Sequence, residues 1–517
     1  MTVDKDLERR KISRVLISVS DKSNISKLSV EFKRLGIEII STGGTSKILN
    51  QNGIDVVPVE DITNFPELMD GRVKTLHPLI FGGILARGSD SKEVKQHDIK
   101  TIDMVICNLY PFLDAASNGA ELATLIEKID IGGPSLLRAA AKNYNRVTVV
   151  TDPADYEWIV KEIELGGLNL KQRRQLALKA FRHTTDYDTL IQKVLAEQFD
   201  EEGLPPSLHI SGLGNPPLRY GENPHQSAIF YSDLLFEGPS VSNAVQIQGK
   251  QLSYNNLLDF DAALAIVTEF EEPTAVIVKH NNPCGAASGK NLLEAYNLAI
   301  QTDPQSAFGG IISFNRVVTS SLSKEIINSF KEGIIAPSFT KNALEVLSQK
   351  KNLRVLEIGE LEEYSRSHSM RSLDGGWLLQ EADEVSIDIS KCKVVSNRKP
   401  TPEEFDALAF GWKIVKHVKS NAILFAKDKR TVGIGAGQMS RIDSVKIAIF
   451  KSIPDAQNTV MASDAFFPFR DGIDEAAKVG ITAVIQPGGS IRDQEVIDAA
   501  NEHNMAMIFT AVRHFKH

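Results

Sequence analysis

Hydrophobic and polar positions alternate regularly along the first 200 residues. Short runs rich in Val and Ile have the length of buried strands, at residues 14–20, 37–42, 56–59, 104–109 and 147–152. Between them, residues 24–36 and 45–53 show helical spacing and end on Gly, which commonly closes a helix. A longer helical run at residues 171–199 would close this part of the chain. Strands that alternate with helices predict a mostly parallel sheet covered on both faces.

The second part of the chain also has an α/β pattern. It follows residues 200–217, which concentrate Gly, Pro and Ser and form the best linker candidate. Its strand candidates are residues 274–280, 309–314, 421–428, 431–437, 484–489 and 505–510, and its helical candidates are residues 291–303, 402–418 and 492–504. A charged, irregular stretch around residues 359–384 would divide this part into two lobes.

The composition narrows the class of protein. A chain of 517 residues exceeds one ordinary core and predicts several domains. No apolar run approaches the roughly 18 residues of a membrane-spanning helix, and residues 1–14 lack the apolar centre of a signal peptide. The net charge of −8 disfavours a general nucleic-acid binder but leaves small anionic ligands open. Three widely spaced cysteines, Cys107, Cys284 and Cys392, favour a reducing cytoplasm.

A phosphate cradle is predicted in the first part of the chain. Loops after strand candidates line the ligand crevice of an open parallel sheet. In STGGTSK (41–47), Gly43 and Gly44 let backbone amides approach a ligand, and Thr45 is a candidate helix cap. Lys22, in a second hydroxyl-rich loop, adds positive charge. An ordinary Gly turn with a Thr cap remains the alternative.

A second group of candidate residues follows in the same part. IDIGGPSLLRAAAKN (129–143) places Asp130 ahead of a Gly-Gly-Pro turn, and Arg138 and Lys142 share one face of the helix after it. A solvated surface explains such cations, although their apolar flanks favour a buried anion as partner. Tyr110 lies just past a buried strand, where packing is the alternative role.

In VKHNNPCGAA (278–287), Lys279 and His280 stand at the carboxyl end of a buried strand candidate. Adjacent strand residues point to opposite faces, so both serve one site only where the strand breaks into a loop. A like charge disfavours protonation of His280, and a neutral imidazole is what a general base requires. A histidine with no chemical role at a strand end is the alternative.

Metal and thiol chemistry are less well supported at this stretch. A zinc site needs three or four ligands, and no second cysteine lies near Cys284. NPCG resembles half of the deaminase pattern PCxxC, but Ala287 occupies the second cysteine position. A small buried cysteine in a turn is therefore expected, and no metal site is predicted.

Several further motifs are rich in polar or aromatic side chains. LRYGENPHQ (218–226) is too polar for a core and suits either ligand recognition or a solvated loop. GIGAGQMSR (433–441) is a weak dinucleotide fingerprint. The aromatic cluster in SDAFFPFRD (463–471) suits a flat ligand slot or ordinary core packing.

These motifs, in this order, resemble the bifunctional family that joins AICAR formyltransferase to IMP cyclohydrolase. The resemblance runs nearly end to end and includes SVSDKS, STGGT, VKTLHP, NLYPF, SAFGG, VKSNAI and the terminal RHF. It implies a Rossmann-like, methylglyoxal-synthase-like cyclohydrolase domain over residues 1–200 and a linker over 201–217. It also implies a transformylase region over 218–517, with two cytidine-deaminase-like α/β lobes that divide near 360–385.

The resemblance implies the chemistry of both sites. In the transformylase, the AICAR amine attacks the formyl group of 10-formyltetrahydrofolate, with His280 as base, Lys279 assisting and no zinc. Ligand-binding positions would be Arg219, Tyr220, Asn421, Gln438, Phe466, Asp471, Arg513 and Phe515. In the cyclohydrolase, FAICAR closes to IMP, with catalytic positions Lys74, Tyr110, Asp130 and Lys142. The phosphate would contact Ser20, Lys22, Ser41, Gly43, Gly44 and Thr45.

The resemblance further implies a cytoplasmic homodimer with shared transformylase sites. The expected partners are AICAR, FAICAR and folate, with no nucleic acid and no membrane. Leu79 and Phe81 replace a Lys and a His that the family usually shows. They keep an alternative open, namely a transformylase whose first domain binds nucleotide without catalysis. A non-catalytic phosphate-ligand sensor is the rival from another class.

Overall fold

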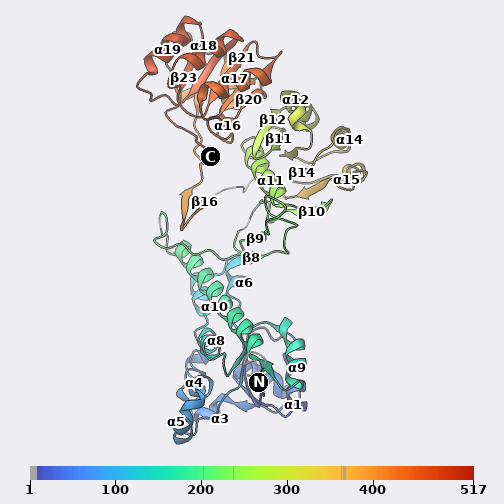
Figure 1. Cartoon of the computed structure of the whole chain (residues 1–517), viewed down its shortest axis with the longest axis vertical. Helices are drawn as coiled ribbons and strands as arrows, with labels where there is room; N and C mark the ends of the chain where they lie inside the picture. The colour runs from blue at the N-terminus through green and yellow to red at the C-terminus, as the bar shows by residue number, and fades with distance from the viewer. Residues whose placement is uncertain (1–7, 202, 237, 362–363, 365–367) are drawn as a thin grey trace, which may run out of the picture. The chain divides into compact units, whose positions relative to one another are not determined.

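The chain divides into two compact units, residues 1–212 and 213–517 (Figure 1). The computed structural model describes residues 8–517 except 202, 237, 362–363 and 365–367. Parts of the predicted linker and of the predicted lobe boundary, and the first seven residues, therefore lie outside the described residues. No helix in the described part of the chain is long and apolar enough to cross a membrane.

The first unit is built on a parallel five-stranded sheet of order β4-β3-β2-β5-β6. Its strands are β2 (Arg14–Val19), β3 (Glu38–Ser41), β4 (Val57–Pro58), β5 (Met104–Asn108) and β6 (Thr148–Val150), and a small separate pair joins β1 (Arg9–Arg10) to β7 (Leu168–Asn169). Every residue of β5 is buried, as expected of a strand covered on both faces. The predicted parallel α/β architecture of this part is confirmed.

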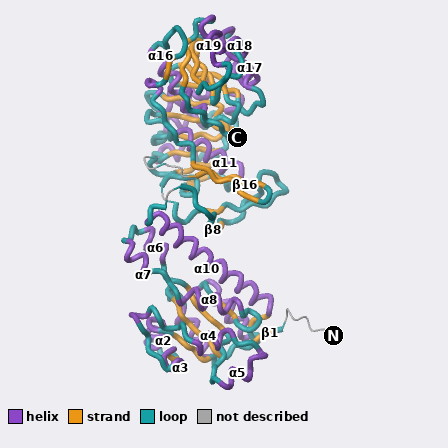
Figure 2. Tube along the Cα trace, turned by 90° about the vertical axis from the view of Figure 1, so that its left-hand side faces the viewer, coloured by secondary structure: helices purple, strands orange, loops and turns teal. Residues whose placement is uncertain are grey.

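Helices flank this sheet. They are α1 (Ile25–Arg34), α2 (Gly43–Gln51), α3 (Val59–Thr63), α4 (Pro78–Leu85), α5 (Ser91–Gln96), α6 (Phe112–Ser117), α7 (Leu122–Glu127), α8 (Gly132–Lys142), α9 (Tyr156–Glu164) and α10 (Leu170–Gln198). The long helix α10 runs alongside α8 and packs on β6 (Figure 2). It begins with a reciprocal capping box, in which the side chains of Asn169 and Gln172 each accept the other residue's amide.

The second unit contains one twelve-stranded sheet of order β10-β15-β14-β13-β11-β12-β20-β19-β21-β22-β23-β18. The two halves mirror each other: in each, an antiparallel hairpin lies at the centre and three parallel strands lead outward to an antiparallel edge strand. Within the sheet, the halves join through one registered pair of strand residues, Ala287 with Arg430. The α/β pattern of this part therefore resolves into two lobes of equal topology.

The strands of the first lobe are β10 (Val245–Gln248), β11 (Thr274–Lys279), β12 (Asn282–Ser288), β13 (Ile311–Phe314), β14 (Gly333–Ala336) and β15 (Arg354–Glu357). Those of the second are β18 (Lys393–Val394), β19 (Ile423–Lys427), β20 (Arg430–Gly435), β21 (Thr459–Ser463), β22 (Ile481–Gln486) and β23 (Ala506–Phe509). A separate pair joins β8 (Leu213–Gly214) to β9 (Tyr231–Ser232).

The helices also correspond between the lobes. The first lobe has α11 (Tyr254–Val267), α12 (Leu292–Thr302), α13 (Pro304–Ala307), α14 (Ser320–Ile326) and α15 (Lys341–Leu347), and the second has α16 (Pro402–Val415), α17 (Arg441–Ser452), α18 (Asp471–Lys478) and α19 (Asp493–Glu502). Helices α11 and α16 occupy equivalent places, and Phe260 and Trp412 on them belong to one shared core. Between the lobes lies the hairpin of β16 (His368–Leu373) and β17 (Gly376–Glu381).

One element differs from the expectation at the opening of the first lobe. Residues 282–288 form strand β12, although Asn, Pro and Gly had indicated a loop. A Cβ on Gly285 would lie 2.0 Å from the carbonyl oxygen of Ala299, so the glycine lets helix α12 lie directly on the strand. Cys284 therefore lies in a strand and not in a turn, which corrects the sequence prediction.

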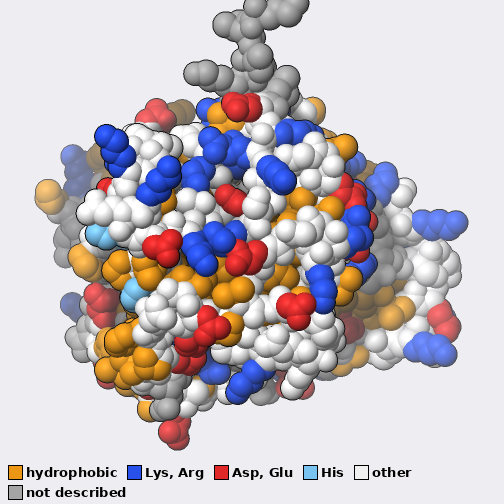
Figure 3. Space-filling view, turned by 90° about the horizontal axis from the view of Figure 1, so that it is seen from below, with side chains coloured by type: hydrophobic (Ala, Val, Ile, Leu, Met, Phe, Trp, Pro, Cys, Tyr) orange, Lys and Arg blue, Asp and Glu red, His pale blue; other side chains and the backbone are white. Residues whose placement is uncertain are grey.

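Charge is mixed on the face of the molecule drawn in Figure 3, where basic and acidic side chains are interspersed. The chain carries 58 Lys and Arg against 66 Asp and Glu. A nucleic-acid binder typically gathers its basic residues into a stripe, and that face has no such stripe among the residues described on it.

Candidate active sites

A cleft of about 620 Å³ opens in the first unit, where the carboxyl ends of the parallel strands meet. Loops after β2, β3 and β5 and the start of α8 contribute to its walls. Seven of the predicted site residues line it together: Ser20, Lys22, Gly44, Thr45, Lys74, Tyr110 and Asp130. The structure thus gathers residues from loops far apart in sequence into one concave site.

One end of this cleft is the N-terminus of helix α2. The helix starts at Gly43 with Thr42 as N-cap, and the side chain of Thr42 makes no capping hydrogen bond. The first amides of a helix lack internal acceptors and attract anions. Thr45 is not the cap that the sequence indicated, because its hydroxyl donates to the carbonyl oxygen of Val19, 3.2 Å away.

Two predicted phosphate contacts have different surroundings. The Ser41 side chain is buried and donates to the carbonyl oxygen of Ile17 at 2.8 Å, so its hydroxyl supports the sheet and does not line the cleft. Lys22 lines the cleft, with its ammonium 3.3 Å from the carbonyl oxygen of Ser20. Lys22 therefore holds a positive charge beside the free end of α2.

Asp130 also lines the cleft, just before α8. Its Oδ1 accepts the amide of Gly133 at 2.8 Å. A Cβ on Gly133 would lie 2.4 Å from Asp130 Oδ2, so only glycine leaves room for the carboxylate there. Burial raises the pKa of Asp130, and the Gly133 amide and the Lys74 ammonium oppose that rise. The site thus pairs a partly desolvated carboxylate with a nearby cation.

Lys142 is not brought to the cleft. It ends α8, whereas Gly132 and Gly133, which line the cleft, begin it. Eleven residues of helix at about 1.5 Å per residue separate the two ends. Lys142 and Arg138 are both exposed, and Arg138 lies over the ring of Phe181. The solvated-surface interpretation describes both cations better than a place in the cleft.

Sequence reasoning missed several residues that line this cleft. Arg72 and Thr75 flank Lys74, and Glu127 precedes Asp130 by three residues. Asn108 holds the loop after β2, because its Oδ1 accepts the amides of Ser20 at 2.6 Å and Asp21 at 2.8 Å. These residues lie within or next to the motifs VKTLHP, NLYPF and IDIGG, and this closeness in sequence could have identified them as candidates.

In the second unit, Lys279 and His280 occupy the end of the central hairpin. Lys279 pairs with Asn282, so His280 and Asn281 form the two-residue connection between β11 and β12. Both have positive φ, 79° and 62°, as a type I′ turn requires. The predicted break in the strand is present, and it leaves His280 exposed and Lys279 half-buried.

Asp259 on helix α11 holds this turn. Its Oδ1 accepts the amide of His280 at 3.1 Å and that of Asn281 at 2.7 Å. Burial raises the pKa of Asp259, while these amides and the charge of Lys279 oppose the rise. No local pattern could have identified this residue, because it contacts the turn from 21 positions away.

Cys284 is a structural side chain. Its Sγ lies 3.5 Å from the carbonyl oxygen of Ile277, and burial raises the pKa of the thiol to about 12. A thiol that stays protonated at neutral pH is a poor nucleophile. In the described part of the chain, no group of three or more His, Cys, Asp or Glu side chains is placed to hold a metal ion.

Cys284→Ala therefore has a small expected effect. We expect the turnover predicted for this unit to stay within about twofold of the parent, and the free energy of unfolding to fall by about 1 kcal/mol. Steady-state kinetics and urea unfolding measure the two quantities. A loss of turnover beyond about 100-fold in a folded variant would restore the thiol hypothesis.

Other predicted residues lie along the edge next to this turn. Asn282 Oδ1 accepts the amide of Lys419 at 2.9 Å, and the carbonyl of Lys419 accepts the amide of Gly437 at 2.7 Å. Asn421 then donates through its amide to Gln438 O at 3.1 Å. Hydrogen bonds thus connect the Lys279–His280 turn to the loops that carry Asn421 and Gln438.

The chain terminus joins the same edge. The amide of Ser420 donates to Lys516 O at 2.8 Å, and the Arg513 guanidinium stacks 4.3 Å from the centre of the Phe515 ring. Both Arg513 and Phe515 are exposed. These groups remain available to a ligand that approaches this edge.

The remaining predicted residues are less closely tied to the turn. Arg219 lies over the Tyr220 ring at 5.4 Å, in a loop that contacts the first turn of α11. Of the aromatic cluster, Phe467 is buried in the core, whereas Phe466 and Phe469 are exposed. The Oδ1 of Asp471 accepts the amide of Gly472 at the start of α18. No contact links these residues to His280 among those described.

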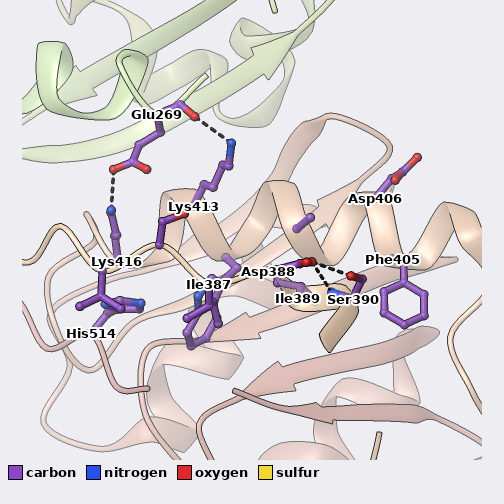
Figure 4. A pocket seen from close by; sticks show the side chains of 14 residues that line it. Glu269, Ile387, Asp388, Ile389, Ser390, Phe405, Asp406, Lys413, Lys416 and His514 are labelled. Atoms are coloured by element: carbon purple, nitrogen blue, oxygen red, sulfur yellow. Dashed lines mark hydrogen bonds and ion pairs between the residues drawn. The ribbon is translucent and has the colours of Figure 1, made fainter. Parts of the chain in front are cut away.

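A smaller cavity of about 300 Å³ lies beside α16 in the second unit (Figure 4). Around it, Glu269 accepts Lys416 at 2.6 Å, and its backbone carbonyl accepts Lys413 at 2.9 Å. These contacts tie the segment just after α11 to α16. None of the predicted site residues is among the residues that line this cavity.

Comparisons with known proteins identify relatives along the chain. Residues 140–451 match the family AICARFT/IMPCHase bienzyme, and residues 24–135 match the family MGS-like domain. "Bifunctional purine biosynthesis protein PurH" of Persephonella marina is 49% identical over 514 residues, or 98% of this chain and 99% of that protein. The protein of the same description from Bacillus subtilis is 48% identical over 511 residues, or 98% and 100%. A solved chain described as "Crystal structure of ForH" is 37% identical with a TM-score of 0.32, and covers 36% of this chain and 100% of its own.

Proposed function

The chain belongs to the AICARFT/IMPCHase bienzyme family and catalyses the two final steps of purine biosynthesis, and we propose how its residues divide the work. The first step formylates AICAR, and the second closes the product to IMP. The predicted activities are thus confirmed, as is the order of an MGS-like domain followed by the transformylase region. The assignments that follow concern individual residues, donor and assembly.

For formyl transfer, we assign the base to His280. The AICAR amine is conjugated with its ring and carboxamide, so it needs proton removal as it attacks the formyl carbon. His280 is exposed on a turn whose backbone Asp259 fixes, which suits a group that must reach a substrate. Lys279 steadies the tetrahedral oxyanion or protonates the departing folate nitrogen. Asn421, Gln438, Arg513 and Phe515, on the adjoining edge, bind AICAR and folate.

The formyl donor is folate-derived in this family, and we propose 10-formyltetrahydrofolate. Its pterin is planar and aromatic, and exposed Phe466 and Phe515 offer flat apolar surfaces for it. Arg219, Tyr220 and Asp471 complete the proposed ligand contacts.

For ring closure, the carrying observation is the convergence of Asp130, Lys74 and the α2 N-terminus on one cleft. The FAICAR phosphate binds at the amides of Gly43 and Gly44 with Lys22, and the reacting groups reach Asp130 and Lys74. The carboxamide nitrogen attacks the formyl carbon, and water leaves. Asp130 takes a proton from the attacking carboxamide nitrogen, and Lys74 polarises the formyl oxygen. That oxygen then leaves as water with this proton and the proton of the formylated amine nitrogen. Tyr110 lines the wall beside them.

The family substitutions at Leu79 and Phe81 do not weaken this assignment. Both residues lie on α4, and neither is among the residues that line the cleft. The alternative of a first domain that only binds nucleotide therefore loses the sequence feature that suggested it.

We also propose a cytoplasmic homodimer that shares transformylase sites. The β16–β17 hairpin exposes Met370, Leu373, Trp377 and Leu378, with Trp377 67% accessible. Large apolar side chains gathered on one exposed element commonly mark a protein interface. The three cysteines are free, which suits a reducing compartment.

A joint assay tests the division of labour. The purified protein receives AICAR and 10-formyltetrahydrofolate, and FAICAR and IMP are followed by chromatography; a parallel sample receives FAICAR alone. We expect IMP in both samples. Accumulation of FAICAR in the first and its persistence in the second would indicate a transformylase only. Binding of AICAR without any folate-dependent turnover would instead support the sensor.

A further inference from the structure

Tyr187 contacts both loops that carry catalytic groups of the first cleft. It lies on α10 and is 7% exposed. Its hydroxyl oxygen accepts the amide of Asp130 at 2.9 Å, and its proton is donated to the carbonyl oxygen of Lys128 at 2.9 Å. Burial raises the pKa of Tyr187 to about 12, so the hydroxyl keeps that proton at neutral pH.

The ring of Tyr187 reaches the second loop. It meets the ring of Phe112 edge-on, with centroids 6.4 Å apart and an interplanar angle of 75°. Phe112 is buried and stands two residues after Tyr110, whose side chain lines the cleft. Tyr187 thus contacts the Asp130 segment through its hydroxyl and the Tyr110 segment through its ring.

The backbone contact has a direct consequence for the carboxylate. Two hydrogen bonds fix Asp130: its backbone amide donates to the Tyr187 hydroxyl, and its Oδ1 accepts the amide of Gly133. Without the Tyr187 hydroxyl, the Asp130 amide and the Lys128 carbonyl lose their partner, which favours movement of this segment. Displacement of a catalytic group by about 1 Å can cost about 100-fold in rate.

We propose that Tyr187 is a positioning residue for ring closure. Its hydroxyl and its ring fix the positions of the Asp130 loop and the Tyr110 loop relative to each other. This proposal rests on the assignment of Asp130 to that reaction. It also means that the cleft is supported by α10, which contributes no lining residue and lies outside residues 24–135 that match the MGS-like domain. The ring-closing site therefore depends on a helix beyond that domain.

Tyr187→Phe and Tyr156→Phe form a matched pair for the test. Tyr156 is also buried in the first unit, but its hydroxyl has no hydrogen-bond partner among the described residues. Kinetics of FAICAR closure are measured in the full-length protein. We expect Tyr187→Phe to lower kcat about 10- to 100-fold with KM within about twofold, because the phosphate end of the cleft is untouched. Tyr156→Phe should leave both constants unchanged.

Phe112→Leu is the second variant, since it removes the contact with the Tyr187 ring, leaves both partners of the Tyr187 hydroxyl in place and keeps an apolar side chain at this buried position. A smaller fall in kcat is expected from it. Formyl transfer and thermal unfolding, measured on every variant, show that the protein is folded. Ring closure by Tyr187→Phe at the rate of Tyr156→Phe would overturn the proposal. Asp130→Asn is assayed in parallel, and full ring closure by that variant would instead refute the assignment of Asp130 itself.

Discussion

His280→Asn lowers kcat/KM for formyl transfer by about 10²–10⁴-fold, the range expected when a general base is removed. Asparagine is the suitable replacement because His280 has a φ of 79°, a conformation that Asn adopts at less cost than most other residues. The turn and its two hydrogen bonds to Asp259 should therefore persist. The variant lacks only the imidazole. Initial rates with saturating 10-formyltetrahydrofolate measure the effect.

The controls for this variant separate chemistry from folding. The proposed ring-closing site lies in the other unit, so closure of FAICAR should remain at the parent rate. AICAR binding, measured by calorimetry, should persist because the proposed ligand contacts at Asn421 and Gln438 are intact. If His280→Asn transfers the formyl group at more than about a tenth of the parent rate, another group removes the proton.

The sequence predicted the first unit well because its signals are local. Strands such as β2 and β5 are continuous apolar runs, and each is followed by a loop that carries polar residues. Ligands bind at the carboxyl ends of parallel strands, and this rule assigns the loops of Lys22 and Thr45, after β2 and β3, to one crevice. Lys74 is separated from the preceding strand, β4, by helix α3. All three residues line the same cleft.

Prediction from the sequence failed where the conformation of a segment depends on contacts with residues far away in the sequence. Strand β12 contains Asn, Pro and Gly, and its extended form comes from pairing with β11 and from close packing of α12 at Gly285. Lys142 ends α8 and is not among the residues that line the cleft, so its catalytic role stays a prediction of the resemblance alone. Asp259 and Tyr187 hold the proposed catalytic loops by hydrogen bonds to backbone atoms. Contacts of this kind produce no hydrophobic periodicity or motif from which they could be predicted.

Asp130→Asn should abolish ring closure and leave the fold intact. The amide keeps an Oδ1 that accepts the Gly133 amide, so the segment retains its shape, but the group no longer takes up a proton at neutral pH. We expect the rate of IMP formation from FAICAR to fall by about 10²–10⁴-fold. Formyl transfer should be unchanged, so FAICAR accumulates when AICAR and the folate are supplied together.

Stability provides an independent check on the same variant. Burial raises the pKa of Asp130, so the folded protein holds the protonated form more tightly than the unfolded chain does. That contribution to stability is present at low pH and is lost as the pH rises through the folded-state pKa. At pH 7 the buried, ionised carboxylate therefore lowers the free energy of unfolding, and the neutral side chain of asparagine removes this destabilisation. We expect the free energy of unfolding of Asp130→Asn to equal or exceed that of the parent at pH 7, and the difference to vanish near pH 4 or lower. A variant that is less stable at pH 7 would show that the carboxylate is held by more favourable contacts than those with Gly133 and Lys74.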